Sequence, residues 1–431
     1  MSALPKEALR RGWCPSTLRP METGDGWLVR LHPPGNALSP RQLGRIAELA
    51  QEHGNGLVEI SARGNLQLRG VTAETHPALV EALLSEGLVD EAEGDGPQRL
   101  TLTSPLAGHD PSDLIDAAAL AAAIEASSRS IPGLPAKTCI VVDGGGTLSL
   151  DHVAADLRVV AIGSGKVAIG TPRGRWLGPA APAAVPDIVA SLLHGFAAGL
   201  PTFAAVRRMR DLPEAGLSGM IAKCGLAETQ PPARRPAPKR AGVPSLGPSC
   251  FAVLIGLPFG RSDAATLAQL GAAAEARGST TIRFSPWRGL AFVDLDWIQA
   301  QALVGLADEL GLITQNTDPR LSVQACAGAP ACLRGETRAS RDAATLAEAA
   351  APLLAAGLKL HVSGCVKSCA NPGPADLTLV GHEGHYDAVF SGTTRDKPAG
   401  RLDLSQIVQR LQPGQDFHTR LTSGRASGPK V

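Results

Sequence analysis

The stretch WLVRLHPPGNALSPRQLGRIAELAQEHG, Trp27–Gly54, occurs again in altered form as FAVLIGLPFGRSDAATLAQLGAAAEARG, Phe251–Gly278. At this offset of 224 residues, Trp27–Val89 aligns with Phe251–Ile313 over 63 positions without a gap, and twelve pairs are identical. Some of the matches reflect the abundance of Ala and Leu. The alignment nevertheless predicts two copies of one folding unit. Duplicated units of this kind usually pair around a pseudo-twofold axis, and a binding site commonly lies between them.

Each copy is predicted to fold as strand–helix–strand–strand–helix. In the first copy the elements are Trp27–Leu31, a helix capped by Ser39, Leu57–Ser61, Leu66–Val71 and a helix near Pro77–Glu86. Asp263 is the corresponding cap in the second copy. Ser and Asp are preferred at this position because their side chains accept a hydrogen bond from a free backbone N–H. We expect Gly54 to end the first helix in a left-handed conformation.

Composition and charge exclude several classes of function. The 431 residues include 41 Lys and Arg against 40 Asp and Glu, a net charge of +1 that provides no global attraction to nucleic acid or to an anionic membrane. The most apolar helical patterns, Asp116–Ile124 and Asp187–Leu200, are short and interrupted. The N-terminal residues Met1–Glu7 lack the apolar core of a signal peptide. We therefore expect a cytoplasmic protein, in which structural disulfides are rare.

The segment Thr229–Ser249, TQPPARRPAPKRAGVPSLGPS, separates the two halves of the chain. It is rich in Pro and basic residues and has no apolar periodicity, so we expect a semi-extended, mobile linker. A second echo lies in the later part of each half. Ala154–Val160 resembles Pro374–Val380 at an offset of 220 residues, but only the later copy has cysteines beside it.

Four of the eight cysteines form the pattern C-x5-C…C-x3-C: Cys326, Cys332, Cys365 and Cys369. On a helical turn, Cys365 and Cys369 would share one face. Four thiolates in two short loops suit a [4Fe–4S] cluster. A structural zinc site and four unrelated core cysteines remain alternatives, although the five-residue gap counts against zinc. The remaining cysteines have no ligand spacing, and most are predicted to be small buried hydrophobic residues: Cys14, Cys139, Cys224 and Cys250.

Three further motifs make the chain resemble the nitrite/sulfite reductase superfamily over most of its length, from about Gly12 to about Val380. Ser61–Gln67, SARGNLQ, resembles the superfamily's T-x-R-x-x-x-Q. Arg99–Gly108, RLTLTSPLAG, resembles R-N-V-T-G-S-P-L-A-G, and Leu134–Cys139, LPAKTC, resembles L-P-R-K-F-K. Members carry siroheme and a [4Fe–4S] cluster, and the last cluster cysteine also bridges to the siroheme iron. The four cysteines match this cluster motif.

The resemblance implies roles for individual residues. Arg63, Arg99 and Lys137 match basic residues that surround the substrate anion and the tetrapyrrole carboxylates. Four further cationic residues are weaker candidates for binding the substrate carboxylates: Arg19, Arg30, Arg288 and Lys367. Cys139 stands where sulfite reductases place a second catalytic Lys. The loss of that basic group weakens the interpretation as an anion reductase, because reduction of a small oxyanion needs dense positive charge.

A narrower resemblance is to the cobalamin-pathway branch of the superfamily, the precorrin-3B synthases. It rests on Arg11–Arg30, RGWCPSTLRPMETGDGWLVR, and on the cysteine loops Cys326–Arg334, CAGAPACLR, and Gly364–Gly381, GCVKSCANPGPADLTLVG. This branch uses molecular oxygen to hydroxylate precorrin-3A at C20 and closes a lactone from the ring A acetate. The resemblance implies a [4Fe–4S] cluster, a mononuclear non-haem iron, and electrons that come from NAD(P)H through an external reductase. The tetrapyrrole would be a substrate where relatives hold siroheme.

The fold implied by the resemblance is α+β, internally duplicated, with ferredoxin-like half-domains and two α/β domains. The expected segments are a first half-domain at 12–110, a first α/β domain at 130–228, a linker at 229–249, a second half-domain at 250–318 and an iron–sulfur α/β domain at 319–420. The alternative functions are a siroheme-dependent sulfite or nitrite reductase and a non-catalytic tetrapyrrole or iron–sulfur carrier.

The mononuclear iron cannot be placed from the sequence. His382-Glu383-Gly384-His385 contains residue types that bind such an ion. However, Gly384 predicts a hairpin turn at this point.

Overall fold

The computed structural model describes residues 13–90, 95–202, 206–411, 419 and 421, so the N-terminal Met1–Glu7 lies outside the described residues. Two of its sheets come from the duplicated stretches. In spatial order, the first sheet consists of β1 (Met21–Thr23), β2 (Gly26–Leu31), β5 (Leu66–Val71), β4 (Leu57–Ile60) and β13 (Arg261–Asp263). The second sheet consists of β12 (Phe251–Gly256), β15 (Gly289–Leu295), β14 (Ile282–Ser285) and β3 (Ala37–Leu38).

The two duplicated sheets exchange one short strand each. Strand β13 of the second copy pairs with β4 of the first, with Arg261 opposite Glu59. Strand β3 of the first copy pairs with β14 of the second, with Ala37 opposite Arg283. All four positions are related by the offset of 224 residues. The copies therefore pair reciprocally, as the predicted pseudo-twofold arrangement requires.

The helices that cover these sheets are α1 (Pro40–His53), α2 (His76–Ser85), α6 (Ala264–Ala276) and α7 (Trp297–Glu309). Both predicted caps are confirmed: the Ser39 side chain accepts from Gln42 N, and Asp263 accepts from Thr266 N. Helices α1 and α6 pack closely, because a Cβ on Gly271 would lie 2.9 Å from the Pro40 carbonyl.

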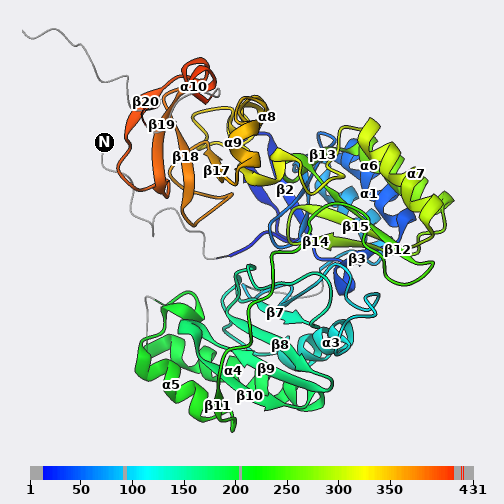
Figure 1. Ribbon diagram of the computed structural model, residues 1–431, viewed down its shortest axis with the longest axis vertical. Coiled ribbons are helices and arrows are strands. Elements are labelled where there is room, and N and C mark those ends of the chain that lie inside the picture. The colour runs from blue at the N-terminus through cyan, green and yellow to red at the C-terminus, as the bar shows by residue number, and fades with distance from the viewer. Residues whose placement is uncertain (1–12, 91–94, 203–205, 412–418, 420, 422–431) are drawn as a thin grey trace, which may run out of the picture.

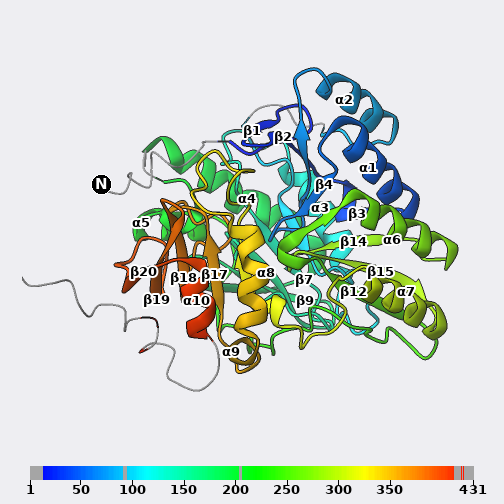
Figure 2. The same cartoon turned by 90° about the horizontal axis from the view of Figure 1, so that it is seen from above.

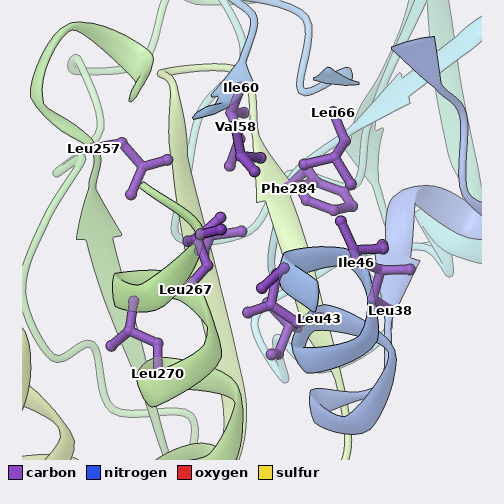
Figure 3. Packing of buried hydrophobic residues seen from close by; sticks show 14 of the residues in the cluster. Leu38, Leu43, Ile46, Val58, Ile60, Leu66, Leu257, Leu267, Leu270 and Phe284 are labelled. Carbon is purple, nitrogen blue, oxygen red and sulfur yellow. The ribbon is translucent and has the colours of Figure 1, made fainter. Parts of the chain in front are cut away.

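One shared core joins the two copies. Leu43 and Ile46 of α1, Leu267 of α6 and Phe284 of β14 are fully buried between the helices and the sheets. Figure 3 shows these side chains converging from both copies. Burial of each such side chain contributes roughly 1.5–3 kcal/mol. The two copies are thus held together by apolar packing as well as by paired strands.

The predicted left-handed end of the first helix is wrong at Gly54. Its backbone is extended, with φ −129° and ψ −155°. Glycine is needed there for a different reason, since a Cβ would lie 2.4 Å from the Arg69 carbonyl oxygen. The left-handed residue comes two positions later, at Gly56, where φ is 75°.

The other two sheets share one topology. One contains β6 (Thr101–Thr103), β7 (Ile140–Asp143), β8 (Leu157–Gly163), β9 (Lys166–Gly170), β10 (Trp176–Ala180) and β11 (Glu228–Thr229). The other contains β16 (Val323–Ala325), β17 (Leu360–Ser363), β18 (Ala375–His382), β19 (His385–Gly392) and β20 (Gly400–Leu402). In each sheet the first three strands are parallel and the fourth is antiparallel. The weaker echo at offset 220 corresponds to β8 and β18, the third strand of each sheet.

Each of these sheets has its own helices. The β6–β11 sheet packs with α3 (Ala117–Ser128), α4 (Val185–Gly199) and α5 (Glu214–Ala222), and the β16–β20 sheet with α8 (Ala339–Ala349), α9 (Ala351–Ala355) and α10 (Leu404–Leu411). Figure 1 shows both α/β parts beside the paired copies, with the β16–β20 part to their left and the β6–β11 part below, and Figure 2 shows the same arrangement from above.

One helical stretch, Pro182–Thr202, is long and apolar enough to cross a membrane by length and composition alone. Its α4 part carries a stripe of fully buried side chains that belong to the core of the β6–β11 sheet: Val189, Leu192, Leu193 and Phe196. This packing is that of a core helix in a folded domain.

The predicted linker at 229–249 lacks helix, as expected, but the expectation that it is mobile does not match its contacts. Arg235 donates to the Gly146 carbonyl at 2.8 Å and pairs with Asp143. Arg240 donates to the Leu321 carbonyl at 2.7 Å. The basic residues Arg235 and Arg240 therefore fix this segment to the rest of the protein.

Candidate functional site

The four predicted cluster cysteines follow two neighbouring parallel strands. Cys326 comes directly after β16, and Cys365 follows β17 after one glycine. The carboxyl ends of parallel strands meet at one edge of a sheet, so the two loops leave together. The Gly364 N–H donates to the Cys326 Sγ at 3.1 Å. We call loops 326–338 and 364–371, with their four thiols, the cysteine cradle.

Glycines let the two loops of the cradle interlock. A Cβ on Gly364 would lie 3.0 Å from the Gly328 α-carbon, and one on Gly335 would meet the same atom at 3.0 Å. Gly328 itself has φ 66°, a left-handed conformation that glycine adopts without strain. Gly328 therefore lets the two loops of the cradle approach each other closely.

The electrostatics of the thiols show that they are neighbours. Burial raises the pKa of Cys369 to about 11; Lys367 lowers it, and the charges of Cys326, Cys365 and Cys332 raise it further. Cys369 nevertheless keeps solvent-exposed area. Both observations describe a thiol that protein surrounds on most sides and that opens to solvent on one. Burial also raises the pKa of Cys365.

The donor set fits a [4Fe–4S] cluster better than a single ion. Within the described parts of the chain, no three His, Cys, Asp or Glu side chains are grouped closely enough to hold one metal ion. A tetrahedral zinc site needs four ligands around one ion, whereas a cubane spreads four thiolates over four irons. Because the pKa values of Cys365 and Cys369 are raised, cluster binding would release protons from these thiols.

The helical turn expected for Cys365 and Cys369 is wrong. Residues 364–372 form bends and turns without helix, and Ser368 has φ 61°. An irregular loop lets both side chains converge with those of the first loop, which a regular helix would constrain.

Two of the predicted substrate-binding residues, Arg63 and Lys137, meet beside this cradle. Arg63 lies in the turn between β4 and β5, where the Ser61 hydroxyl accepts from the Arg63 and Asn65 N–H groups at 3.3 and 3.1 Å. Its guanidinium donates to the Lys137 carbonyl at 3.0 Å. Burial lowers the pKa of Lys137; Cys14 raises it, and the cations Arg63, Lys367 and Arg30 lower it further.

Arg99, the third predicted residue, is directed inward. Its guanidinium donates to the Arg63 carbonyl and to Asn65 Oδ1, both at 2.6 Å, and also bonds Asn36. Burial lowers its pKa to about 10. These bonds hold the turn that contains Arg63. Arg99 therefore positions Arg63 and does not itself offer a free guanidinium to a carboxylate.

Two of the weaker candidates join Arg63 and Lys137. Arg30 donates through Nε and Nη2 to Gln67 Oε1 at 2.9 and 2.7 Å. Burial lowers its pKa, and the nearby Cys14 raises it. Lys367 stands between two of the cluster cysteines. We call Arg30, Arg63, Lys137 and Lys367 the cationic cluster. The prediction that most of the non-ligand cysteines are buried is wrong: Cys139 is buried, whereas Cys14, Cys224 and Cys250 are partly exposed.

The structure places the other two weaker candidates outside the cationic cluster. Arg19 is half exposed, pairs with Asp95, and lies 4.4 Å from the Trp13 ring centroid. Arg288 is partly buried and donates to Gln324 and to the Ala370 carbonyl of the second cradle loop. Each of these guanidinium groups is bonded to an acceptor of the protein and is therefore not free to bind a substrate carboxylate.

Sequence reasoning missed Arg69, which ties the first copy to the cradle. It is 3% exposed and donates to Asp25 at 2.5 and 3.0 Å and to the Ala331 carbonyl, beside Cys332, at 2.6 Å. The bond to Ala331 spans 262 positions of the chain. Nothing in the local sequence signals such a long-range contact.

The predicted hairpin at His382–His385 is confirmed, and it offers no site for a mononuclear iron. Glu383 and Gly384 form the turn between β18 and β19 with φ 51° and 79°. His382 Nδ1 lies 3.1 Å from Asp387, and His385 Nδ1 lies 3.0 Å from the Glu383 carbonyl. The described residues of this hairpin do not fit this ion.

Comparison with known proteins agrees with this geometry. Residues 19–86 match the family model of the nitrite/sulfite reductase ferredoxin-like half domain. A precorrin-3B synthase from Sinorhizobium sp is 32% identical over 450 residues, which cover 97% of this chain and 94% of that protein. The chain belongs to the precorrin-3B synthase family. This confirms the narrower of the two resemblances read from the sequence.

More distant relatives of this precorrin-3B synthase family member confirm the superfamily and the α+β fold. A ferredoxin-dependent sulfite reductase from Mycobacterium tuberculosis is 26% identical, covering 84% of this chain and 72% of that protein. The solved structure of the Mycobacterium tuberculosis NirA protein superposes with a TM-score of 0.72 at 21% identity, over 93% of this chain and 84% of that one.

Proposed function

We propose that this chain acts as a precorrin-3B synthase in the cytoplasm: it hydroxylates precorrin-3A at C20 with molecular oxygen and closes the ring A acetate as a lactone. The observation that carries the proposal is that the cationic cluster and the cysteine cradle meet, with Lys367 belonging to both. A polycarboxylate macrocycle and an electron source would thereby be neighbours.

We propose that Cys326, Cys332, Cys365 and Cys369 hold a [4Fe–4S] cluster. When bound, the cluster would supply electrons one at a time, delivered from NAD(P)H by an external reductase. The interlocking glycines and the mutual electrostatic effects of the four thiols support this assignment. The raised pKa values of Cys365 and Cys369 mean that these two thiols stay neutral until the cluster's positive irons favour the thiolates.

The chain's own residues bind and orient the substrate. Arg63 can offer its guanidinium to a carboxylate as a planar fork, and Lys137 can offer a movable ammonium. A carboxylate placed between them would offset the repulsion among Lys137, Lys367 and Arg30, and would raise the pKa of Lys137 that these cations now lower. Arg99 holds the Arg63 turn in place through its carbonyl.

Cys139 argues against the alternative, a siroheme-dependent sulfite or nitrite reductase. It replaces a catalytic Lys of the sulfite reductases and is 5% exposed, inside an apolar cluster with Leu102 and Val141. Burial raises its pKa, so it contributes no positive charge. The protein therefore lacks one of the cations that reduction of a small oxyanion requires.

The test is turnover of precorrin-3A by anaerobically purified holoprotein with a reductant and isotopically labelled O2. Two electrons and two protons reduce one oxygen atom to water, so the product should gain one labelled oxygen and contain the lactone. Siroheme in the extracted pigment, together with reduction of sulfite or nitrite, would establish the alternative. Pigment binding without turnover under any reductant would indicate a carrier.

A further inference from the structure

The turn between β14 and β15 holds a residue in an unfavourable conformation. Arg288 has φ 62°, and the corresponding residue of the first copy, Gly64, has φ 64°. The two turns are built alike: Ser285 Oγ accepts from Trp287 N at 3.2 Å, as Ser61 Oγ accepts from Arg63 N at 3.3 Å. The turn thus requires a left-handed residue at this place. Glycine meets that need without cost, whereas arginine costs of order 1 kcal/mol.

The surroundings of Arg288 have adjusted to its side chain. A Cβ on Gly260, in the 3-10 turn Pro258–Gly260, would lie 2.8 Å from Arg288 Cδ. The first copy has the opposite arrangement, with Asn36 at the position of Gly260 and Gly64 at that of Arg288. A Cβ on Gly64 would approach Asn36 Nδ2 at 3.1 Å. Each copy therefore has room for one side chain here, and only the second uses it for a cation.

The guanidinium of Arg288 reaches the second loop of the cysteine cradle. One nitrogen donates to the Ala370 carbonyl at 2.8 Å, directly after Cys369, and another donates to Gln324 on β16. Burial lowers the pKa of Arg288 to about 10, and Glu59 and Cys326 raise it. A largely buried cation is costly without negative charge nearby, and the thiolates of a bound cluster would supply such charge.

We propose that Arg288 is a positioning residue for the cysteine cradle: it fixes the Cys365–Cys369 loop through the Ala370 carbonyl and places a permanent positive charge beside the cluster. The inference rests on the proposed [4Fe–4S] cluster. Because a cluster held by four thiolates gains negative charge on reduction, a fixed cation nearby raises its reduction potential. The strain in the backbone persists because the surrounding contacts hold it.

Three variants separate the side chain, its charge and the backbone strain. R288M keeps the strain and removes the charge and the hydrogen bonds. R288K keeps the charge. R288G removes both the side chain and the strain, as in Gly64. The matched control is R240M, because Arg240 lines the same cavity of about 140 Å³ and likewise donates to one backbone carbonyl, that of Leu321, away from the cradle.

The first measurement is hydrogen exchange of the apoprotein, which needs no cluster. We expect peptides spanning Cys365–Asn371 to exchange roughly tenfold faster in R288M and R288G than in the wild type, since the loop loses its anchor. R240M should leave these peptides unchanged. The second measurement is the midpoint potential of the holoprotein, which should become more negative in R288M, remain close to wild type in R288K, and not shift in R240M.

Wild-type exchange and wild-type potential in R288M would overturn the proposal, as would an R288G variant indistinguishable from the wild type in both measurements. If R288M does not fold, R288G and R288K decide the question. A wild-type protein that binds no cluster would instead overturn the proposed function, while the exchange result would still report on Arg288.

Discussion

The two copies of the duplicated sheet have the same register and opposite chemistry on the face away from the shared core. In the first copy this face is polar and meets the cysteine cradle through Arg69. In the second it is largely apolar and packs against Leu106 and Leu148, which lie in the loops after β6 and β7. The corresponding residues are Arg30 and Leu254, Gln67 and Ala291, and Arg69 and Val293.

The loops that face these sheets differ in the same complementary way. After β17 the chain reads Gly364–Cys369 and carries two of the thiols. After β7 it reads Gly144–Ser149, without cysteine, and Arg235 of the linker donates to the Gly146 carbonyl and pairs with Asp143. The loops after β16 and β17 form the cysteine cradle. The corresponding loops after β6 and β7 are occupied by the side chain of Arg235.

The reciprocal pairing of the copies explains why a single site results. Each duplicated sheet packs on the loops of the other half, so duplication created two equivalent places. In one, a polar sheet from the first half meets the thiols of the second. In the other, an apolar sheet meets loops that Leu106, Leu148 and Arg235 fill. The first half therefore supplies the polar sheet, and the second half supplies the thiols.

Cys365→Ser tests this difference with the largest effect. Because each thiolate holds one corner of the proposed cluster, iron, sulfide and activity should disappear together. Cys250→Ser is the matched control, since Cys250 packs against the apolar cluster of the filled place and should leave iron and sulfide unchanged. Full iron and sulfide content in C365S would show that the cluster assignment is wrong.

Glu59→Ala should destabilise the polar sheet by about 3 kcal/mol, because the partly buried Arg261 would lose its acid and the buried Arg69 would keep only Asp25. Glu59 is paired with Arg69 at 3.5 Å and with Arg261 across the exchanged strand, and also accepts from Gln67 at 2.9 Å. Chemical denaturation measures the change, and Glu59→Gln should recover part of it. An unchanged denaturation midpoint in E59A would contradict the importance of this polar network.

Lys137→Ala should weaken tetrapyrrole binding by about 1.5–3 kcal/mol, the range for a hydrogen bond to a charged group. Fluorescence quenching or calorimetry with precorrin-3A measures the affinity. Iron and sulfide content should remain at the wild-type level, because Lys137 is not a proposed ligand. Unchanged affinity would remove Lys137 from the substrate site.

The place that Leu106, Leu148 and Arg235 fill should make the stability of the protein depend on pH. Burial, followed by the charge of Asp110, raises the pKa of Asp113 to about 7 from the usual 3.8. The folded state therefore binds this proton more tightly than the unfolded state, and its contribution to stability is present at low pH and lost as the pH rises towards 7. Denaturation of Asp113→Asn at about pH 5 and about pH 8 should show a smaller pH difference than the wild type. An equal difference would contradict the assignment.

Arg283→Met should have the smallest effect. Arg283 occupies the position that corresponds to Glu59, is 8% exposed, and donates to Thr103 Oγ1 at 3.2 Å, while its Nε lacks a partner. Replacing a poorly compensated buried charge by an apolar side chain is often neutral or stabilising, so stability should be unchanged or rise by about 1 kcal/mol. A loss above about 2 kcal/mol would show that this face still depends on its charge.

The sequence was sufficient for the features that local patterns encode. The duplication, the caps at Ser39 and Asp263, and the proximity of Arg63 and Lys137 followed from repeats, capping chemistry and motifs. The exchanged strands β3 and β13 did not, because two or three residues are too short to show a periodicity. Arg69 and Arg288 act on loops far along the chain, so only the tertiary fold identifies their acceptors. Gly54 shows the same limit, since its requirement comes from the Arg69 carbonyl.

Strands β3 and β13 also bear on how this polypeptide could have arisen. Since each half completes the other half's sheet, an ancestral single-copy subunit would have had to form a symmetric homodimer with two equal sites. Fusing the genes freed the sites to diverge. Severing the peptide within 229–249 should consequently yield two fragments that are insoluble apart and that reassemble as a heterodimer when co-expressed.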